Sequence, residues 1–202
     1  MEKTVAAYKE ALLLNPHNEG LRLRLASAYK QMGQYEQARD QYLKLLKMNP
    51  GKPQLLHLLA KVYSTLGKSG KAIEFYQEAI KNRPYNPGWY SDRGLVYFNK
   101  GEFDKAISDF SQAVRIEPNY AVAYNNRGSV YFKKGDYDRA ISDFNQALRM
   151  APNYAAAYNN RGLAFSKKGD YDRAREDFQK AQRLGHPVDP VFLKNLPRPV
   201  EK

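Results

Sequence analysis

The stretch YNNRGSVYFKKGDYDRAISDFNQALRMAP, residues 124–152, returns in closely similar form 34 residues later. Between residues 123–140 and residues 157–174, 14 of 18 positions are identical. Self-similarity at a fixed period of about 20 to 50 residues is typical of proteins that are built from stacked structural repeats. The stretch therefore predicts a repeat architecture, and the same period can be followed through most of the chain.

Three further series of residues keep the same 34-residue step. The prolines are Pro16, Pro50, Pro84, Pro118 and Pro152; the glycines are Gly33, Gly67, Gly101, Gly135 and Gly169; the alanines are Ala38, Ala72, Ala106, Ala140 and Ala174. Aromatic residues recur in the same way, at Tyr42, Tyr76, Phe110, Phe144 and Phe178. So many series in one register exclude a chance similarity.

Each repeat is predicted to form two helices. Apolar or small residues spaced i, i+4, i+7 lie on one face of a helix. Such stripes are Tyr124, Gly128 and Tyr131 in the first helix, and Ala140, Phe144 and Ala147 in the second. Gly135 is expected to end the first helix, because glycine adopts the left-handed backbone of a helix C-terminus at little cost. Pro152 cannot continue the second helix.

One such helix pair is too thin to form a core, so the pairs must stack on one another. The pattern resembles the tetratricopeptide repeat, in an array of the bacterial type, over about residues 2–187. The resemblance implies an all-α fold, a right-handed superhelical solenoid of five full repeats and an N-terminal half repeat. The expected divisions of one continuous domain are 1–18 (half repeat, second helix only), 19–52, 53–86, 87–120, 121–154, 155–188, and 189–202 (a short capping turn and a loose tail).

The second repeat departs from the pattern at the start of its second helix. Ser69 stands where the other full repeats carry an aromatic residue, and Gly70 follows it. Glycine inside a helix costs roughly 0.5 to 1 kcal/mol, so we expect a weaker helix start here.

The chain is strongly basic, with a formal net charge of +12 and a pI of about 9.7. Two interpretations stay open: a solvated surface in which lysines match the negative ends of helices, or an acidic or nucleic-acid partner. The chain has no cysteine, which excludes disulfides but does not fix the compartment. It also has no apolar run long enough for a membrane span and no recognisable signal peptide at Met1, which favours a cytoplasmic protein; a periplasmic location stays open, since a fragment would lack its leader.

No catalytic, metal or cofactor site is predicted. Gly67, Lys68 and Ser69 resemble the end of a phosphate-binding loop, but the earlier glycine and the preceding strand of that motif are missing. The three histidines lie in different repeats, and neither His17 nor His57 has a His, Asp or Glu three or four positions later. His186 is followed by Asp189, but one such pair is too few ligands for a metal site. We therefore expect a protein that is not an enzyme and carries no cofactor.

A second stripe of each first helix faces away from the packing positions. In the tetratricopeptide family the corresponding surface lines a concave groove that holds a partner's peptide or helix. We call it the first-helix stripe. Its candidate binding residues are Arg24, Lys30, His57, Lys61, Asp92, Phe98, Asn125, Asn126, Phe132, Lys133, Asn159, Asn160 and Lys167.

The charges of this stripe predict the chemistry of the partner. Five cations and one acid, Asp92, favour an extended segment that is acidic or polar. Asn126 and Asn160 resemble the asparagine ladder of some long tetratricopeptide arrays, in which amide side chains hold an extended backbone. The carboxylate clamp of the family's chaperone-binding members is not expected, because Leu23/Ser27, His57/Lys61 and Ser91/Leu95 do not match its first Lys and Asn pair.

Two alternatives to peptide binding stay open. A basic, tyrosine-rich groove could hold RNA, although most tyrosines occupy packing positions of the repeat. The unpaired helix at the N-terminus could also drive self-assembly through the ends of the array.

Comparison of the repeats predicts one further contact. In the repeats whose seventh position is arginine, the twenty-third position is aspartate. In the repeats whose seventh position is leucine, the twenty-third position is a residue other than aspartate. We therefore expect structural ion pairs between the two helices of a repeat, Arg93 with Asp109, Arg127 with Asp143, and Arg161 with Asp177.

Overall fold

A computed structural model describes residues 1–188, which form eleven α-helices and no strand. The helices are α1 (Glu2–Leu14), α2 (Glu19–Gln31), α3 (Tyr35–Met48), α4 (Pro53–Thr65), α5 (Ser69–Asn82), α6 (Pro87–Asn99), α7 (Phe103–Ile116), α8 (Ala121–Lys133), α9 (Tyr137–Met150), α10 (Ala155–Lys167) and α11 (Tyr171–Arg183). The fold is an all-α helical repeat array, as predicted. The expected capping turn and tail at 189–202 lie outside the described residues.

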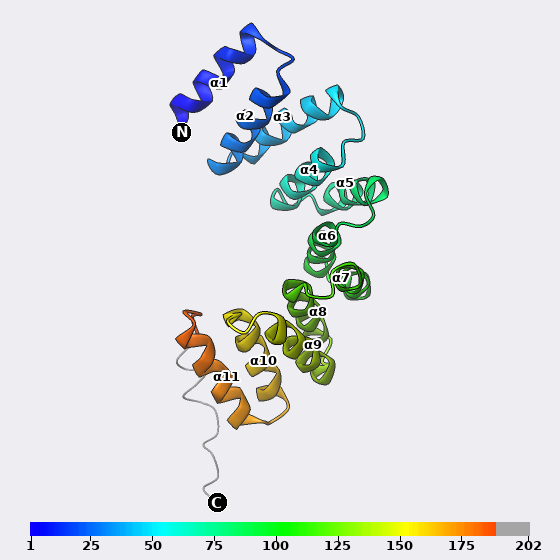
Figure 1. Cartoon of the computed structure of the whole chain (residues 1–202), viewed down its shortest axis with the longest axis vertical. Coiled ribbons are helices and arrows are strands. Elements are labelled where there is room, and N and C mark those ends of the chain that lie inside the picture. Colours follow the sequence, from blue (N-terminus) through cyan, green and yellow to red (C-terminus); the bar gives the residue numbers. More distant parts are fainter. Residues whose placement is uncertain (189–202) are drawn as a thin grey trace, which may run out of the picture. The chain divides into compact units, whose positions relative to one another are not determined.

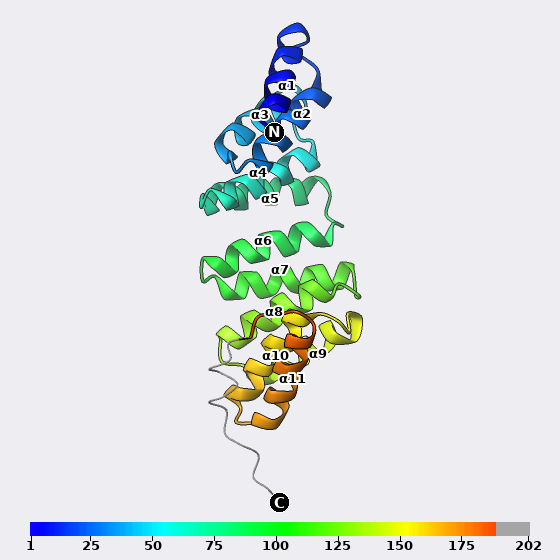
Figure 2. The same ribbon diagram turned by 90° about the vertical axis from the view of Figure 1, so that its left-hand side faces the viewer.

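The chain divides into two compact parts, Met1–Val96 and Tyr97–Lys202, which we call the N-terminal and C-terminal parts. In the N-terminal part α2 packs on α3 and α4 packs on α5, each pair as an antiparallel hairpin, and α1 packs on α2 (Figure 2). In the C-terminal part the pairs α8 with α9 and α10 with α11 have the same form (Figure 1). Helix α10 also contacts α9 and α8, so consecutive repeats share an interface.

The recurring alanines and aromatic residues form the cores. Each alanine of the series from Ala38 to Ala174 is completely buried, and the aromatic residues from Tyr42 to Phe178 are 0 to 2% exposed. Glycine is required where α8 meets α9: a Cβ atom on Gly128 would lie 2.8 Å from Cε1 of Phe144. A small residue of α8 thus faces a large residue of α9 across the helix interface.

The ends of the helices follow the predicted signals. The glycines from Gly33 to Gly169 that recur between paired helices all have φ between 70° and 81°, the left-handed conformation. Asp136 accepts a hydrogen bond from the backbone N–H of Arg139 and so caps α9.

Hydrogen bonds from the Arg139 side chain and backbone lower the pKa of Asp136. Asp170 caps α11 in the same way, and the Arg173 side chain lowers its pKa.

The second repeat keeps its full second helix. Helix α5 begins at Ser69 and runs for 14 residues, the same length as α3, α7 and α9. The ring of Phe75 stacks on Tyr63 of α4, with 5.3 Å between centroids and 6° between planes. Lys71 adds its ammonium group 5.7 Å from the centre of the Tyr63 ring. Ser69 and Gly70 therefore do not shorten the helix.

Within residues 1–188, no helix is both long and apolar enough to cross a membrane.

Candidate functional site

The predicted stripe residues differ in how far they reach solvent. Five cations are exposed: Arg24, Lys30, Lys61, Lys133 and Lys167. The half-buried members are His57, Asp92, Phe98, Asn126, Phe132, Asn159 and Asn160. Asn125 differs from the expectation, because it is 6% exposed and belongs to the interior.

Asn125 is buried because it contacts the next repeat. Nδ2 of Asn160 donates to Oδ1 of Asn125 over 3.0 Å and lies 3.4 Å from Oγ of Ser129. The Ser129 hydroxyl in turn donates to the backbone carbonyl of Asn125 over 2.9 Å. The side-chain N–H groups of Asn160 thus point to residues of the preceding repeat. The side-chain carbonyl oxygen of Asn160 is left for a partner.

A contact between residues 35 positions apart, like that of Asn125 with Asn160, also joins α4 to α6 in the N-terminal part. Nε2 of His57 lies 2.8 Å from Oδ2 of Asp92, and Nζ of Lys61 lies 3.7 Å from the same oxygen. The imidazole also stacks on Trp89, with 5.5 Å between ring centroids. Lys61 therefore neutralises the acid of the stripe. In the sequence, no acidic residue lies one helical turn from His57 on the same helix, whereas Asp92 lies one repeat and one residue further along the chain.

The C-terminal part contains an apolar pocket of about 300 Å³ on the first-helix stripe. Its lining residues are Phe98, Ser129, Phe132, Lys133, Phe144, Asn160 and Leu163. Phe98 packs against Phe103, and Phe132 packs against Tyr137, with ring centroids 5.9 and 5.5 Å apart. The sequence indicated both aromatic wall residues, Phe98 and Phe132. It did not indicate that Phe144, a packing residue, would close the pocket.

Two predicted ion pairs have close geometry in the C-terminal part. Arg127 donates through Nε and Nη2 to both carboxylate oxygens of Asp143, each over 2.8 Å. Arg161 contacts Asp177 over 2.8 and 2.7 Å. Both aspartates are buried. The third pair, Arg93 with Asp109, joins residues of different parts and stays a prediction.

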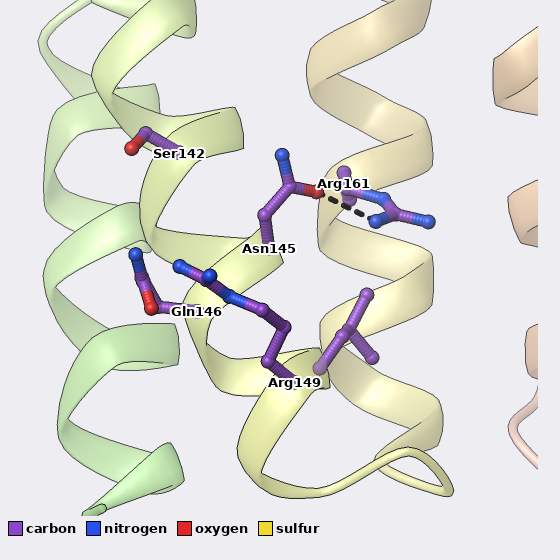
Figure 3. Close-up of a pocket in the computed structure, with 6 residues that line it drawn as sticks. Ser142, Asn145, Gln146, Arg149 and Arg161 are labelled. Carbon is purple, nitrogen blue, oxygen red and sulfur yellow. Dashed lines mark hydrogen bonds between the residues drawn. The ribbon is translucent and has the colours of Figure 1, made fainter.

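The same arginines also reach the preceding repeat. Nη1 of Arg127 donates to Oγ of Ser111 over 3.0 Å, and Nη1 of Arg161 donates to Oδ1 of Asn145 over 2.6 Å. Figure 3 shows Arg161 reaching from α10 to Asn145 on α9, beside Arg149 and Gln146 at a polar hollow. Arg127 and Arg161 therefore each link the second helix of their own repeat to that of the repeat before it. This side of the array has a structural role.

These features define a helical repeat protein whose first helices carry a stripe of exposed and half-buried basic, polar and aromatic residues. Four sequence profiles match the chain, at residues 2–62, 53–86, 94–135 and 119–185; three are described as "Tetratricopeptide repeat" and one as "TPR repeat". The chain belongs to the tetratricopeptide repeat family, a family of protein-interaction scaffolds. A search of curated protein sequences found no match.

Solved structures have the same fold. A crystal structure of MamA is 28% identical, with a TM-score of 0.72 over 80% of this chain and 94% of MamA. YrrB, titled "a TPR protein with an unusual peptide-binding site", is 21% identical, with a TM-score of 0.66 over 88% of this chain and 92% of YrrB. The pilF protein of Pseudomonas aeruginosa is 21% identical, with a TM-score of 0.76 over 84% and 78%. At 21% identity these last two likenesses show the fold alone.

Proposed function

We propose that this chain is a scaffold that binds an extended, acidic or polar peptide segment of a protein partner along its first-helix stripe. The observation that carries the proposal is the position of Lys133 and Lys167. Both are exposed at the same position of consecutive repeats, and Lys133 borders the apolar pocket. The pocket supplies apolar surface for contact, and the lysines select for carboxylates.

The charge of the stripe supports an acidic partner. Among the described residues that line the pocket there is one cation and no carboxylate. The acid of the stripe, Asp92, is already within 3.7 Å of Lys61. Exposed cations attract a carboxylate less strongly as salt rises, so binding should weaken between low and moderate ionic strength.

The neighbouring lysines provide a matched control. Lys134 contacts Asp104 over 2.5 Å, and Lys168 contacts Asp138, so these lysines join helices of consecutive repeats. Each follows a stripe lysine directly in the sequence. Replacing either lysine pair by glutamine therefore removes the same net charge from adjacent positions.

The test is a pull-down from nuclease-treated lysate with three immobilised proteins: wild type, Lys133→Gln/Lys167→Gln and Lys134→Gln/Lys168→Gln. We expect a protein captured by wild type and by the Lys134/Lys168 variant, and lost with Lys133→Gln/Lys167→Gln or at moderate salt. Equal capture by all three proteins would contradict the proposal. In a parallel pull-down from untreated lysate, capture of material that is absent after nuclease treatment would instead support RNA binding.

Part of the tyrosine surface is closed to base stacking. Tyr29, Tyr42, Tyr63, Tyr76 and Tyr97 are buried at packing positions, whereas the other tyrosines are half-buried or exposed. Stacking of bases needs an accessible ring face. Self-assembly through the ends of the array stays a prediction.

A further inference from the structure

We propose that the apolar pocket on the first-helix stripe is an anchor site for one large apolar side chain of the bound peptide, with an acidic residue beside it. This inference rests on the proposed function and adds to it, because charge alone would select any acidic segment. The occupant we infer is a phenylalanine- or leucine-sized side chain in an acidic segment. The neighbouring carboxylate would face Lys133.

The walls of the pocket are apolar and preformed. Phe98 and Phe132 occupy the same position of consecutive repeats, and Leu163 lies on the next first helix, α10. Each phenylalanine is held by an aromatic residue at the start of the following helix, Phe103 or Tyr137. Phe144, which is completely buried, also lines the pocket. A ligand would therefore need little rearrangement of side chains to enter.

The hydrogen-bond donors of Ser129 and Asn160, which line the pocket, are bonded to their own array. Ser129 donates to the backbone carbonyl of Asn125 and accepts from Asn160, which also donates to the Asn125 side chain. Polar groups that already have partners do not lose hydrogen bonds when water leaves the pocket. An apolar side chain can therefore displace water here without leaving a donor unpaired.

Size and charge narrow the occupant further. A volume of about 300 Å³ is at the lower end of the range of small-molecule pockets, which fits one side chain better than a larger group. Lys133 is exposed at the edge, so it can pair with a carboxylate that stays in solvent. A large apolar residue in a pocket, surrounded by polar contacts, is the usual form of an energetic anchor.

The other repeats provide variants that the fold tolerates. The position of Phe98 and Phe132 holds Ser64 and Ser166 in two other repeats. The position of Leu163 likewise holds Ser27 and Ser129. Phe132→Ser and Leu163→Ser therefore remove wall residues of the pocket, and each introduces a residue that other repeats already have at the same position. The matched control is Leu95→Ser. Leu95 occupies the same position of its repeat as Leu163, but it is exposed and does not line the pocket.

The first probe is N-acetyl-phenylalanine amide, with N-acetyl-alanine amide as its control, in ¹H–¹⁵N spectra of the full chain. We expect saturable shifts from the phenylalanine compound at the amides of Phe98, Ser129, Phe132 and Leu163. They should be lost in Phe132→Ser/Leu163→Ser and kept in Leu95→Ser. Shifts that do not saturate, or that lie elsewhere, would overturn the anchor pocket.

The second probe is a pair of fluorescein-labelled peptides of alternating Glu and Gly, with a central Phe or a central Ala. We expect the Phe peptide to bind wild type about tenfold more tightly, and the difference to disappear in Phe132→Ser/Leu163→Ser. Equal binding of both peptides to wild type would overturn the anchor and leave the proposed function standing. Saturable binding of the phenylalanine amide without binding of either peptide would support the pocket and contradict the acidic partner.

Discussion

Asn160 on α10 donates a hydrogen bond of 3.0 Å to the buried side chain of Asn125 on α8. The two residues are 35 positions apart, one repeat and one residue, as are His57 and Asp92. The fifth position of one repeat thus meets the sixth position of the next. A contact of this kind couples the stability of neighbouring repeats.

Asn125→Ala should lower the free energy of unfolding by about 1 to 2 kcal/mol, because it leaves the Asn160 amide without its best acceptor. Asn126→Ala, one residue along the same helix, should stay within about 0.5 kcal/mol of wild type. Urea unfolding followed by circular dichroism measures both. Equal effects of the two substitutions would mean that the contact between the asparagines contributes nothing specific.

Asp143→Ala should cost about 2 to 4 kcal/mol, because it leaves the Arg127 guanidinium half-buried without its carboxylate. Arg127→Leu/Asp143→Phe should recover most of this loss, since the second repeat carries Leu59 and Phe75 at these positions. Chemical denaturation of the single and double variants provides the comparison. A double variant as unstable as Asp143→Ala would show that the pair cannot be replaced by apolar packing.

Gly128→Ala should destabilise the C-terminal part by about 1 to 3 kcal/mol, because the added methyl group overlaps the ring of Phe144. Gly70→Ala is the control, since nothing lies within 4 Å of a Cβ at this helical glycine. It should be neutral, or stabilising by about 0.5 to 1 kcal/mol. Thermal unfolding of both variants tests the difference, and a harmless Gly128→Ala would contradict the close approach of α8 and α9.

Asp136 should titrate below the ordinary aspartate pKa of about 3.9, because Arg139 bonds its carboxylate. A pKa that is lower in the folded state gives stability that is present above the unfolded pKa and is lost as the pH falls through the folded one. Arg139→Gln should bring the pKa of Asp136 back toward its ordinary value. Carboxyl ¹³C shifts between pH 2 and pH 6 measure it, and an unchanged pKa in the variant would disprove the role of the arginine.

Much of the fold follows from residues whose role repeats every 34 positions. Each of these residues is required for one local reason that can be recognised in a sequence. Pro152 lacks the N–H that would continue a helix, Gly135 adopts a left-handed backbone, and Ala140 allows two helices to approach closely. The pairing of Arg127 with Asp143 could be proposed because the two positions change together between repeats.

The binding surface was less predictable because it depends on how consecutive repeats are offset. Asn125 and Asn126 look equivalent in the sequence, yet the one-residue offset buries the first and leaves the second half-buried. His57 has no local partner, and Asp92 reaches it only through stacking of the repeats. The pocket likewise combines residues of three first helices, α6, α8 and α10, with a core residue of α9, Phe144, which no linear spacing indicates.

The most direct test of peptide binding is a display selection with random twelve-residue peptides on the full chain, followed by titration of the selected peptides. We expect peptides enriched in Asp and Glu whose affinity for Lys133→Gln/Lys167→Gln falls about tenfold or more, while their affinity for Lys134→Gln/Lys168→Gln stays close to that of wild type. Selected peptides without acidic enrichment, or with equal affinity for both variants, would contradict the assignment of the first-helix stripe as the binding site.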